Sequence, residues 1–191
     1  MRIVLATLLA GLFAAAPAMA KPVTYTLDPG HTQVRVTWNH FGFSNPSANF
    51  THVTGTLVYD AEHPQASSVT VNIPMSGLDT HVPALDKHLS AADFFDVAKY
   101  PEAHFVSTRV SEAGKGHLTV VGDLTVHGQT HPVTLHVTVN KIGMQPMLKV
   151  PAAGFDATAT LKRSDFGVGM YVPMVSDEIR VNITVEADAK Q

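Results

Sequence analysis

The chain has 191 residues and a small, balanced charge: 13 Lys and Arg against 16 Asp and Glu give a formal net charge of −3. It has no block of basic residues, which argues against nucleic acid or an anionic membrane surface as a partner. It also has no Cys, so a disulfide framework and a thiolate nucleophile are both excluded and the fold must depend on its hydrophobic core.

The first twenty residues have the features of a secretory signal peptide. Arg2 supplies a short positive region, residues 3–16 form an apolar run rich in Leu and Ala, and Ala18-Met19-Ala20 is a small-x-small cleavage site. Such a segment is too short and wrongly flanked for a membrane span, and no later stretch is long and apolar enough to cross a bilayer. We therefore expect an exported protein, cleaved after Ala20, with one folded domain over residues 21–191.

Alternation of apolar and polar residues dominates the rest of the chain. It covers residues 33–39, 69–73, 133–140, 155–162 and 179–186, and residues 49–59, 103–110 and 117–126 are further strand candidates. A period of two gives each strand one apolar and one wet face. An interior glycine, such as Gly55 or Gly122, often marks a bulge or a sharp bend. The pattern predicts about eight strands.

A helix is predicted at residues 82–95, where the alternation stops. Pro83 stands near its first position. Apolar residues recur there at helical spacing: Leu85, Leu89 and Ala92. The pair Phe94 and Phe95 closes this segment, and residues 100–101, Tyr-Pro, prevent continuation because a residue before proline avoids the α region. An apolar insertion in an otherwise all-β chain needs a surface to cover.

The strands are expected to form an antiparallel sheet. The turn His127-Gly128 joins two of them as a hairpin, because glycine there is free to take a positive φ. Parallel sheets need both faces covered, whereas the outward positions here are Thr, Asn, His, Arg and Glu. The sequence therefore predicts an all-β fold, and both a sandwich and a closed barrel satisfy burial of one face.

Catalytic motifs are missing from the sequence. It has no G-x-S-x-G elbow, no H-E-x-x-H and no glycine-rich phosphate loop. We therefore expect a binding protein rather than an enzyme, and no cofactor. A small hydrolase with an unrecognised site and a sandwich used for protein contacts stay open as alternatives.

Eleven His residues raise the question of metal handling. They are scattered over predicted strands and turns. Imidazole and thioether ligands suit copper, and four Met residues add to the His set: Met144, Met147, Met170 and Met174. Geometry rather than residue count confers metal selectivity, and surface His and core Met are ordinary. We predict no metal site and keep periplasmic copper handling as the alternative function.

Four segments, in order, resemble the YceI-like family. They are residues 28–36, 86–101, 122–135 and 163–169, and the resemblance runs from about Val23 to Ala187. One departure lies at residues 44–48, Ser-Asn-Pro-Ser-Ala, where family members often have a glycine-bearing Ser-x-x-x-Gly stretch.

The resemblance implies a lipocalin-like barrel of eight antiparallel strands, here with the short helical insertion around residues 82–95. In the family, an elongated apolar pore holds a polyisoprenoid or a similar long-chain lipid, such as a prenyl quinone. Members are commonly periplasmic and often homodimeric. A barrel of about eight strands has an interior just wide enough for side chains or one slender ligand. Small inward residues should leave room for it: Gly55, Gly122, Ala157 and Ala159.

Large apolar side chains are the candidates for the pore and its mouth, with plain core packing as the alternative for each. The predicted ligand-binding set is Trp38, Phe41, Phe43, Phe50, Met75, Leu85, Leu89, Phe94, Phe95, Phe105, Phe155, Phe166 and Tyr171. Adjacent aromatics at a helix end cannot both point the same way, so at least one of Phe94 and Phe95 should face the mouth. Arg163 and Asp165 are either a structural pair or contacts to a ligand headgroup, and we favour structure. Residues 88–105 become a proposed cap or gate.

Overall fold

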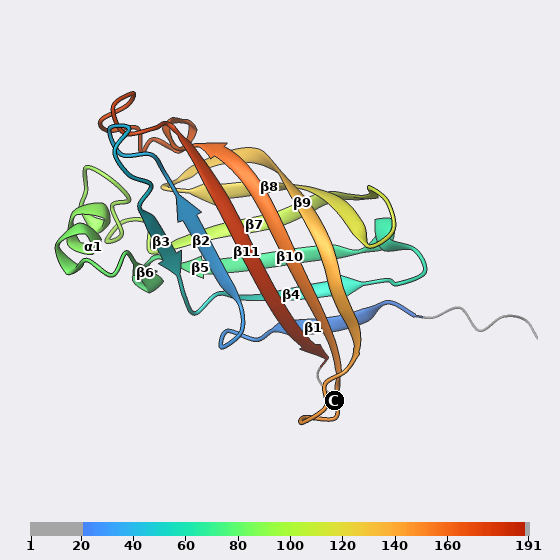
Figure 1. The fold of residues 1–191 in the computed structure, drawn as a ribbon. Coiled ribbons are helices and arrows are strands. Elements are labelled where there is room, and N and C mark those ends of the chain that lie inside the picture. Colours follow the sequence, from blue (N-terminus) through green and yellow to red (C-terminus); the bar gives the residue numbers. More distant parts are fainter. Residues whose placement is uncertain (1–20, 190–191) are drawn as a thin grey trace, which may run out of the picture.

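The strands of the protein wrap into a closed antiparallel barrel with one short helix at one end (Figure 1). The computed structural model describes residues 21–189, so the predicted signal peptide lies outside the described residues. The strands are β1 (Val23–Leu27), β2 (Gln33–Thr37), β3 (Ser47–Phe50), β4 (Thr54–Tyr59), β5 (Ser68–Pro74), β6 (Leu78–Asp79), β7 (Glu102–Glu112), β8 (His117–Val126), β9 (Gln129–Met144), β10 (Pro151–Lys162) and β11 (Glu178–Ala189). The helix is α1 (Pro83–Ser90), and 3-10 turns lie at Pro64–Ala66, Met75–Gly77 and Arg163–Phe166.

Eight strands close the barrel, as predicted. Their order is β1-β4-β5-β7-β8-β9-β10-β11, and β11 returns to β1 through pairs such as Leu27 with Ala187. β2 pairs with the first half of β11 and β1 with its second half, so β2 continues β1 beyond a break in the chain. In the same way β3 continues β4, and β6 continues β5. Eleven segments therefore make eight barrel strands.

The breaks correct the strand predicted over residues 49–59. The chain leaves the sheet at residues 51–53, where His52 takes a φ of 61°, and not at Gly55, which pairs in regular register with Val71. The N–H of Thr51 donates to the carbonyl of Gly77 at 3.0 Å. Two of the breaks therefore lie side by side and support each other.

The predicted hairpin at His127-Gly128 is confirmed. Its two central residues have φ values of 50° and 72°, and Val126 pairs with Gln129 across the turn. Two successive positive φ values match the right-handed twist of the flanking strands. The same turn receives the ring of Tyr100, whose centroid lies 4.7 Å from that of His127.

The helix is shorter than the predicted range of 82–95, because it ends at Ser90. Residues 91–100 form turns instead, closed by the N–H of Asp96 donating to Ala91 at 2.9 Å and the N–H of Val97 donating to Ser90 at 3.2 Å. α1 and these turns lie at the end of the barrel that β3 and β6 extend (Figure 1). Within residues 21–189, no helix has the length and apolar character needed to cross a membrane.

Candidate ligand-binding cavity

The barrel encloses an apolar cavity of about 410 Å³, a volume in the range of small-molecule sites. Every one of the eight barrel strands contributes inward-facing residues to its wall, such as Leu27 from β1, Leu135 from β9 and Ile183 from β11. Within residues 21–189, the wall includes no Asp, Glu or Lys side chain. The cavity therefore offers a long apolar surface and no pair of carboxylates for acid–base chemistry.

One end of the cavity is covered by α1 and the turns that follow it. Five residues of this segment line the cavity: Leu85, His88, Leu89, Phe94 and Phe95. Phe95 packs edge-to-face on Phe50 with 6.2 Å between ring centroids. The ring centroid of Phe94 lies 4.8 Å from that of His88 and 6.2 Å from that of Tyr171. Both members of the Phe pair reach the cavity because they lie in turns and not in a helix.

The cavity approaches the surface at this same end. His40 and Tyr171 line it and are themselves exposed. Both come from loops, His40 from the β2–β3 turn and Tyr171 from the β10–β11 connection. At the far end the wall reaches Ser67 and Ser68, next to the 3-10 turn after β4. Polar residues are thus few in the wall, and besides those named they include Thr32, in the break between β1 and β2.

Eleven of the thirteen predicted residues line the cavity. They are Trp38, Phe50, Met75, Leu85, Leu89, Phe94, Phe95, Phe105, Phe155, Phe166 and Tyr171. Their contact with a ligand stays a prediction, but the structure brings them together around one space.

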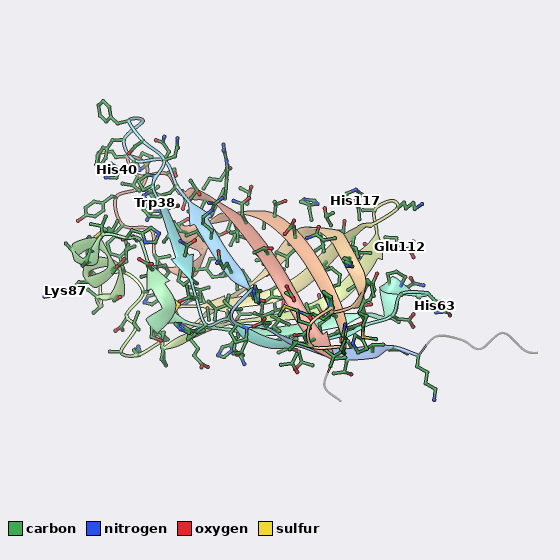
Figure 2. All side chains as sticks on the ribbon, turned by 60° about the horizontal axis from the view of Figure 1, so that its bottom comes forward. Trp38, His40, His63, Lys87, Glu112 and His117 are labelled. Carbon is green, nitrogen blue, oxygen red and sulfur yellow. The ribbon has the colours of Figure 1, made fainter. Side chains whose placement is uncertain are left out.

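Phe41 and Phe43 lie outside the cavity, which corrects their predicted placement. They belong to the β2–β3 turn, which extends beyond the barrel end where Figure 2 labels His40. The N–H of Phe43 donates to His40 at 3.0 Å, and Phe41 and Gly42 take φ values of 53° and 77°. This tight turn carries both rings into solvent, so that Phe43 is 93% exposed.

The predicted ligand-binding set included only large apolar residues, and most of the cavity wall lies outside that set. The wall consists mainly of Val, Leu and Ile on the inward phase of each strand, and the alternation in the sequence already marked that phase. Ala157 and Ala159 line the cavity as expected. Gly55 and Gly122 do not: a Cβ on Gly122 would lie 2.6 Å from Cε2 of Phe105, so that ring takes up the room. The bulge expected at Gly122 is present on the opposite strand, between Ser107 and Arg109.

Arg163 contributes to the wall, but four of its five N–H donors are used within the protein. Its guanidinium donates to four backbone carbonyls: Ser176 at 2.8 Å, Val168 at 2.6 Å, Met170 at 2.8 Å and Val175 at 2.9 Å. Burial lowers the pKa of Arg163. These hydrogen bonds give Arg163 a structural role. Its charged neighbour is Asp177 and not Asp165, and the Asp177 carboxylate accepts the N–H and O–H of Ser164.

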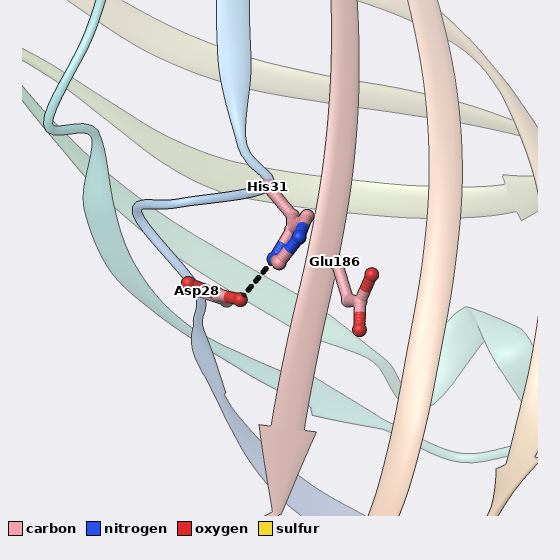
Figure 3. Close-up of side chains that lie close together, drawn as sticks. All are labelled: Asp28, His31 and Glu186. Atoms are coloured by element: carbon pink, nitrogen blue, oxygen red, sulfur yellow. Dashed lines mark hydrogen bonds and ion pairs between the residues drawn. The ribbon is translucent and has the colours of Figure 1, made fainter. Parts of the chain in front are cut away.

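One group of side chains on the outer face has the composition of a metal site. The ligand atoms of Asp28, His31 and Glu186 lie within 4.8 Å of one another (Figure 3). Oδ2 of Asp28 lies 2.6 Å from Nδ1 of His31. This hydrogen bond raises the pKa of His31 and lowers that of Asp28. In the part of the chain that the structure describes, the other His residues join no such group.

The fold and the cavity together define a closed β-barrel protein with an internal apolar site. The family model of the YceI-like domain matches residues 25–187. The chain belongs to the YceI-like family.

Relatives and solved structures agree with this assignment. A UPF0312 protein of Pseudomonas syringae pv. tomato is 39% identical over 180 residues, covering 94% of this chain and 93% of the relative. The crystal structure of Burkholderia cenocepacia BcnA matches with a TM-score of 0.76 at 24% identity, covering 84% of this chain and 98% of that one. A polyisoprenoid binding domain from Saccharophagus degradans matches with a TM-score of 0.66 at 12% identity, covering 88% of this chain and 99% of that domain. Both structures share the fold of this chain.

Proposed function

We propose that this protein is a periplasmic lipid-binding protein. It holds a polyisoprenoid or a similar long-chain amphiphile, such as a prenyl quinone, in the barrel cavity and sequesters or carries it. The observation that carries the proposal is the apolar cavity of about 410 Å³, walled by all eight strands. The fold shared with a domain described as polyisoprenoid binding agrees with it.

The energetics favour a long hydrocarbon over a polar ligand. Each buried CH₂ contributes about 0.8 kcal/mol, offset in part by immobilisation of the chain. A polar or charged ligand would need paired groups inside the barrel, and four of the five N–H donors of Arg163 already bind carbonyls. Binding, rather than catalysis, is the activity that such a wall supports.

Location and assembly belong to the same proposal. Residues 1–20 have the sequence of a signal peptide, which supports export to the periplasm. The family resemblance supports a homodimer, which light scattering of the purified protein tests.

The direct test is to purify the protein from its native host and extract it with organic solvent. We expect a long-chain isoprenoid lipid in the extract by mass spectrometry. An empty protein in every preparation, together with no binding of added prenyl quinone, would refute the proposal.

A plug in the cavity gives a matched comparison. Ala157 is buried and lines the cavity, whereas its neighbour Thr158 on β10 is exposed. We expect Ala157→Phe to abolish most of the bound lipid and Thr158→Phe to leave it unchanged, with the same far-ultraviolet circular dichroism for both. Equal lipid content in the two variants would place the ligand elsewhere.

Metal handling is a second candidate function, favoured by the outer group of Asp28, His31 and Glu186. One imidazole and two carboxylates suit a borderline divalent ion. Calorimetry with Zn²⁺ and Cu²⁺ tests it, with His31→Asn as the comparison. Binding weaker than high micromolar, or binding unchanged by His31→Asn, would exclude this site.

A further inference from the structure

Two loops at the α1 end of the barrel carry exposed apolar side chains. We call residues 39–44 and 171–175 the rim loops. Phe43 is 93% exposed, Met174 58%, Tyr171 49% and Phe41 46%. Monomeric soluble proteins rarely expose contiguous apolar surface without using it. These residues therefore point to an interface with an apolar partner.

The rim loops form one structure although they are far apart in the sequence. His40 forms a β-bridge with Val175. The N–H of Phe41 donates to the carbonyl of Met174 at 3.0 Å, and the N–H of Ser176 donates to the carbonyl of Asn39 at 2.9 Å. The exposed apolar side chains thus belong to a single surface.

Hydrogen bonds from neighbouring residues fix the conformation of both rim loops. The carbonyls that accept from Arg163 lie in or next to the second rim loop, at Val168, Met170, Val175 and Ser176. Oδ1 of Asn39 accepts the N–H of Gly42 at 2.7 Å and holds the first loop. Phe41 and Tyr171 keep positive φ values of 53° and 66°, a conformation uncommon for non-glycine residues. The exposure of the aromatic side chains is therefore a consequence of a defined loop conformation.

The surface carries no formal charge. Residues 38–47 and 166–176 include no Asp, Glu, Lys or Arg. A partner protein that recognised the rim loops by charge would find no charged side chain in them, and an anionic membrane would find no basic residue in them. The composition matches a neutral, apolar-to-polar boundary, where aromatic side chains are favoured.

The same loops adjoin the cavity. Tyr171 and His40 line it while being exposed, and Trp38 lines it directly before the first rim loop. Apolar surface outside the barrel is therefore continuous with apolar surface inside it.

We propose that the rim loops dock this protein on the surface of a lipid bilayer, with Phe43 and Met174 inserted among the headgroups. This inference rests on the proposed function, since the ligand class in question resides in membranes. Docked in this way, the cavity end lined by Tyr171 faces the lipid. A long-chain amphiphile then exchanges between bilayer and barrel without passing through water. Because the contact is apolar, it persists at high salt.

The test places a fluorescent reporter in the rim and a matched reporter at the other end. Trp38 is the single Trp of the chain, so Trp38→Phe removes all native Trp fluorescence. Phe43→Trp then reports on the rim. Gln65→Trp reports on the opposite end, beside the labelled His63 in Figure 2. The two variants differ only in the position of the Trp residue, so a difference in their emission reflects the surroundings of that position.

We expect the Phe43→Trp emission to shift to the blue on neutral phosphatidylcholine vesicles and to be quenched when the lipid chains are brominated close to the headgroup. The Gln65→Trp emission should change in neither experiment. In flotation with the same vesicles, Phe43→Ser in the full chain should lower the partition coefficient about tenfold, at low and at high salt.

No quenching at position 43, or equal quenching at positions 43 and 65, would overturn the docking proposal. So would a homodimer that Phe43→Ser dissociates while vesicles bind neither form, because a second copy would then cover the rim. Mass spectrometry separates this inference from the proposed function. Lipid in the barrel without vesicle binding refutes docking alone, and vesicle binding by a protein that never holds lipid refutes the cavity function alone.

Discussion

At the scale of single residues, the pair of Asp28 and His31 makes a pH-dependent contribution to the fold. His31 occupies the break between β1 and β2, and its hydrogen bond to Asp28 raises its pKa above 6.5. The same bond, with the N–H of Gly30, lowers the pKa of Asp28 below 3.8. The stabilisation from His31 is therefore complete below pH 6.5 and is lost as the pH rises through its folded-state pKa. That from Asp28 is complete above pH 3.8 and is lost as the pH falls through its folded-state pKa.

We predict that the His31 imidazole titrates above 6.5 in NMR spectra of the folded protein. Asp28→Asn should return its pKa toward 6.5, because the charged partner is removed. An unchanged His31 titration in Asp28→Asn would show that the bond is not formed in solution.

A second prediction at this scale concerns Arg163. Four carbonyls accept from one planar guanidinium, and an ammonium has only three donors on a flexible stem. Arg163→Lys should therefore lower the free energy of unfolding by about 2–4 kcal/mol, measured from the urea midpoint with an unchanged m-value. Arg180→Lys, an exposed arginine on β11, should have no such effect. Equal midpoints for the two variants would contradict the assigned role.

At the scale of elements, packing between β7 and β8 depends on a missing side chain. A Cβ on Gly122 would lie 2.6 Å from Cε2 of Phe105 and 2.6 Å from the backbone carbonyl oxygen of Val106, and Phe105 is buried. Gly122→Ala should cost about 1–3 kcal/mol through overpacking, and Phe105→Leu in the same chain should recover part of that loss. Gly143→Ala on β9 is the matched control, because its nearest atom would be Cε of Lys141 at 3.8 Å. A double mutant no more stable than the sum of the single changes would show that the ring is not the obstacle.

The elements also show what local sequence can predict. Alternation predicted the strands and their inward faces, because a strand's two faces follow directly from a period of two. The break at residues 51–53 was missed, because it depends on the hydrogen bond of Thr51 to Gly77, which lies in the 3-10 turn between β5 and β6. The helix was predicted too long for a related reason. Residues 91–100 lie in turns that let Phe94 and Phe95 both reach the cavity, and this is a property of tertiary packing.

The candidate site was predictable to a similar extent. Large apolar residues on strands lined the cavity because the barrel has only one interior. Phe41 and Phe43 did not, although their residue type is the same. The sequence marks this turn by Gly42 and by Asn45-Pro46, but nothing local tells whether a turn folds over a barrel end or extends away from it.

At the scale of the whole molecule, the barrel and its ligand should be one thermodynamic unit. All eight strands line the cavity, so unfolding any of them destroys the site. A ligand that binds only the folded state adds about 2.7 kcal/mol at a hundredfold excess over its Kd. For a domain of this size, that corresponds to a rise in Tm of about 5–10 °C.

The dependence on chain length makes this prediction specific to the cavity. In a series of prenyl alcohols of increasing length, the rise in Tm should grow with each isoprene unit while the added unit is buried, since each CH₂ contributes about 0.8 kcal/mol. The rise should level off once the cavity is full, because further units remain in water. In Ala157→Phe the plateau should come at a shorter chain, and in Thr158→Phe at the same length as in the parent protein. A rise in Tm that ignores chain length, or a plateau that Ala157→Phe does not move, would mean that the lipid binds outside the barrel.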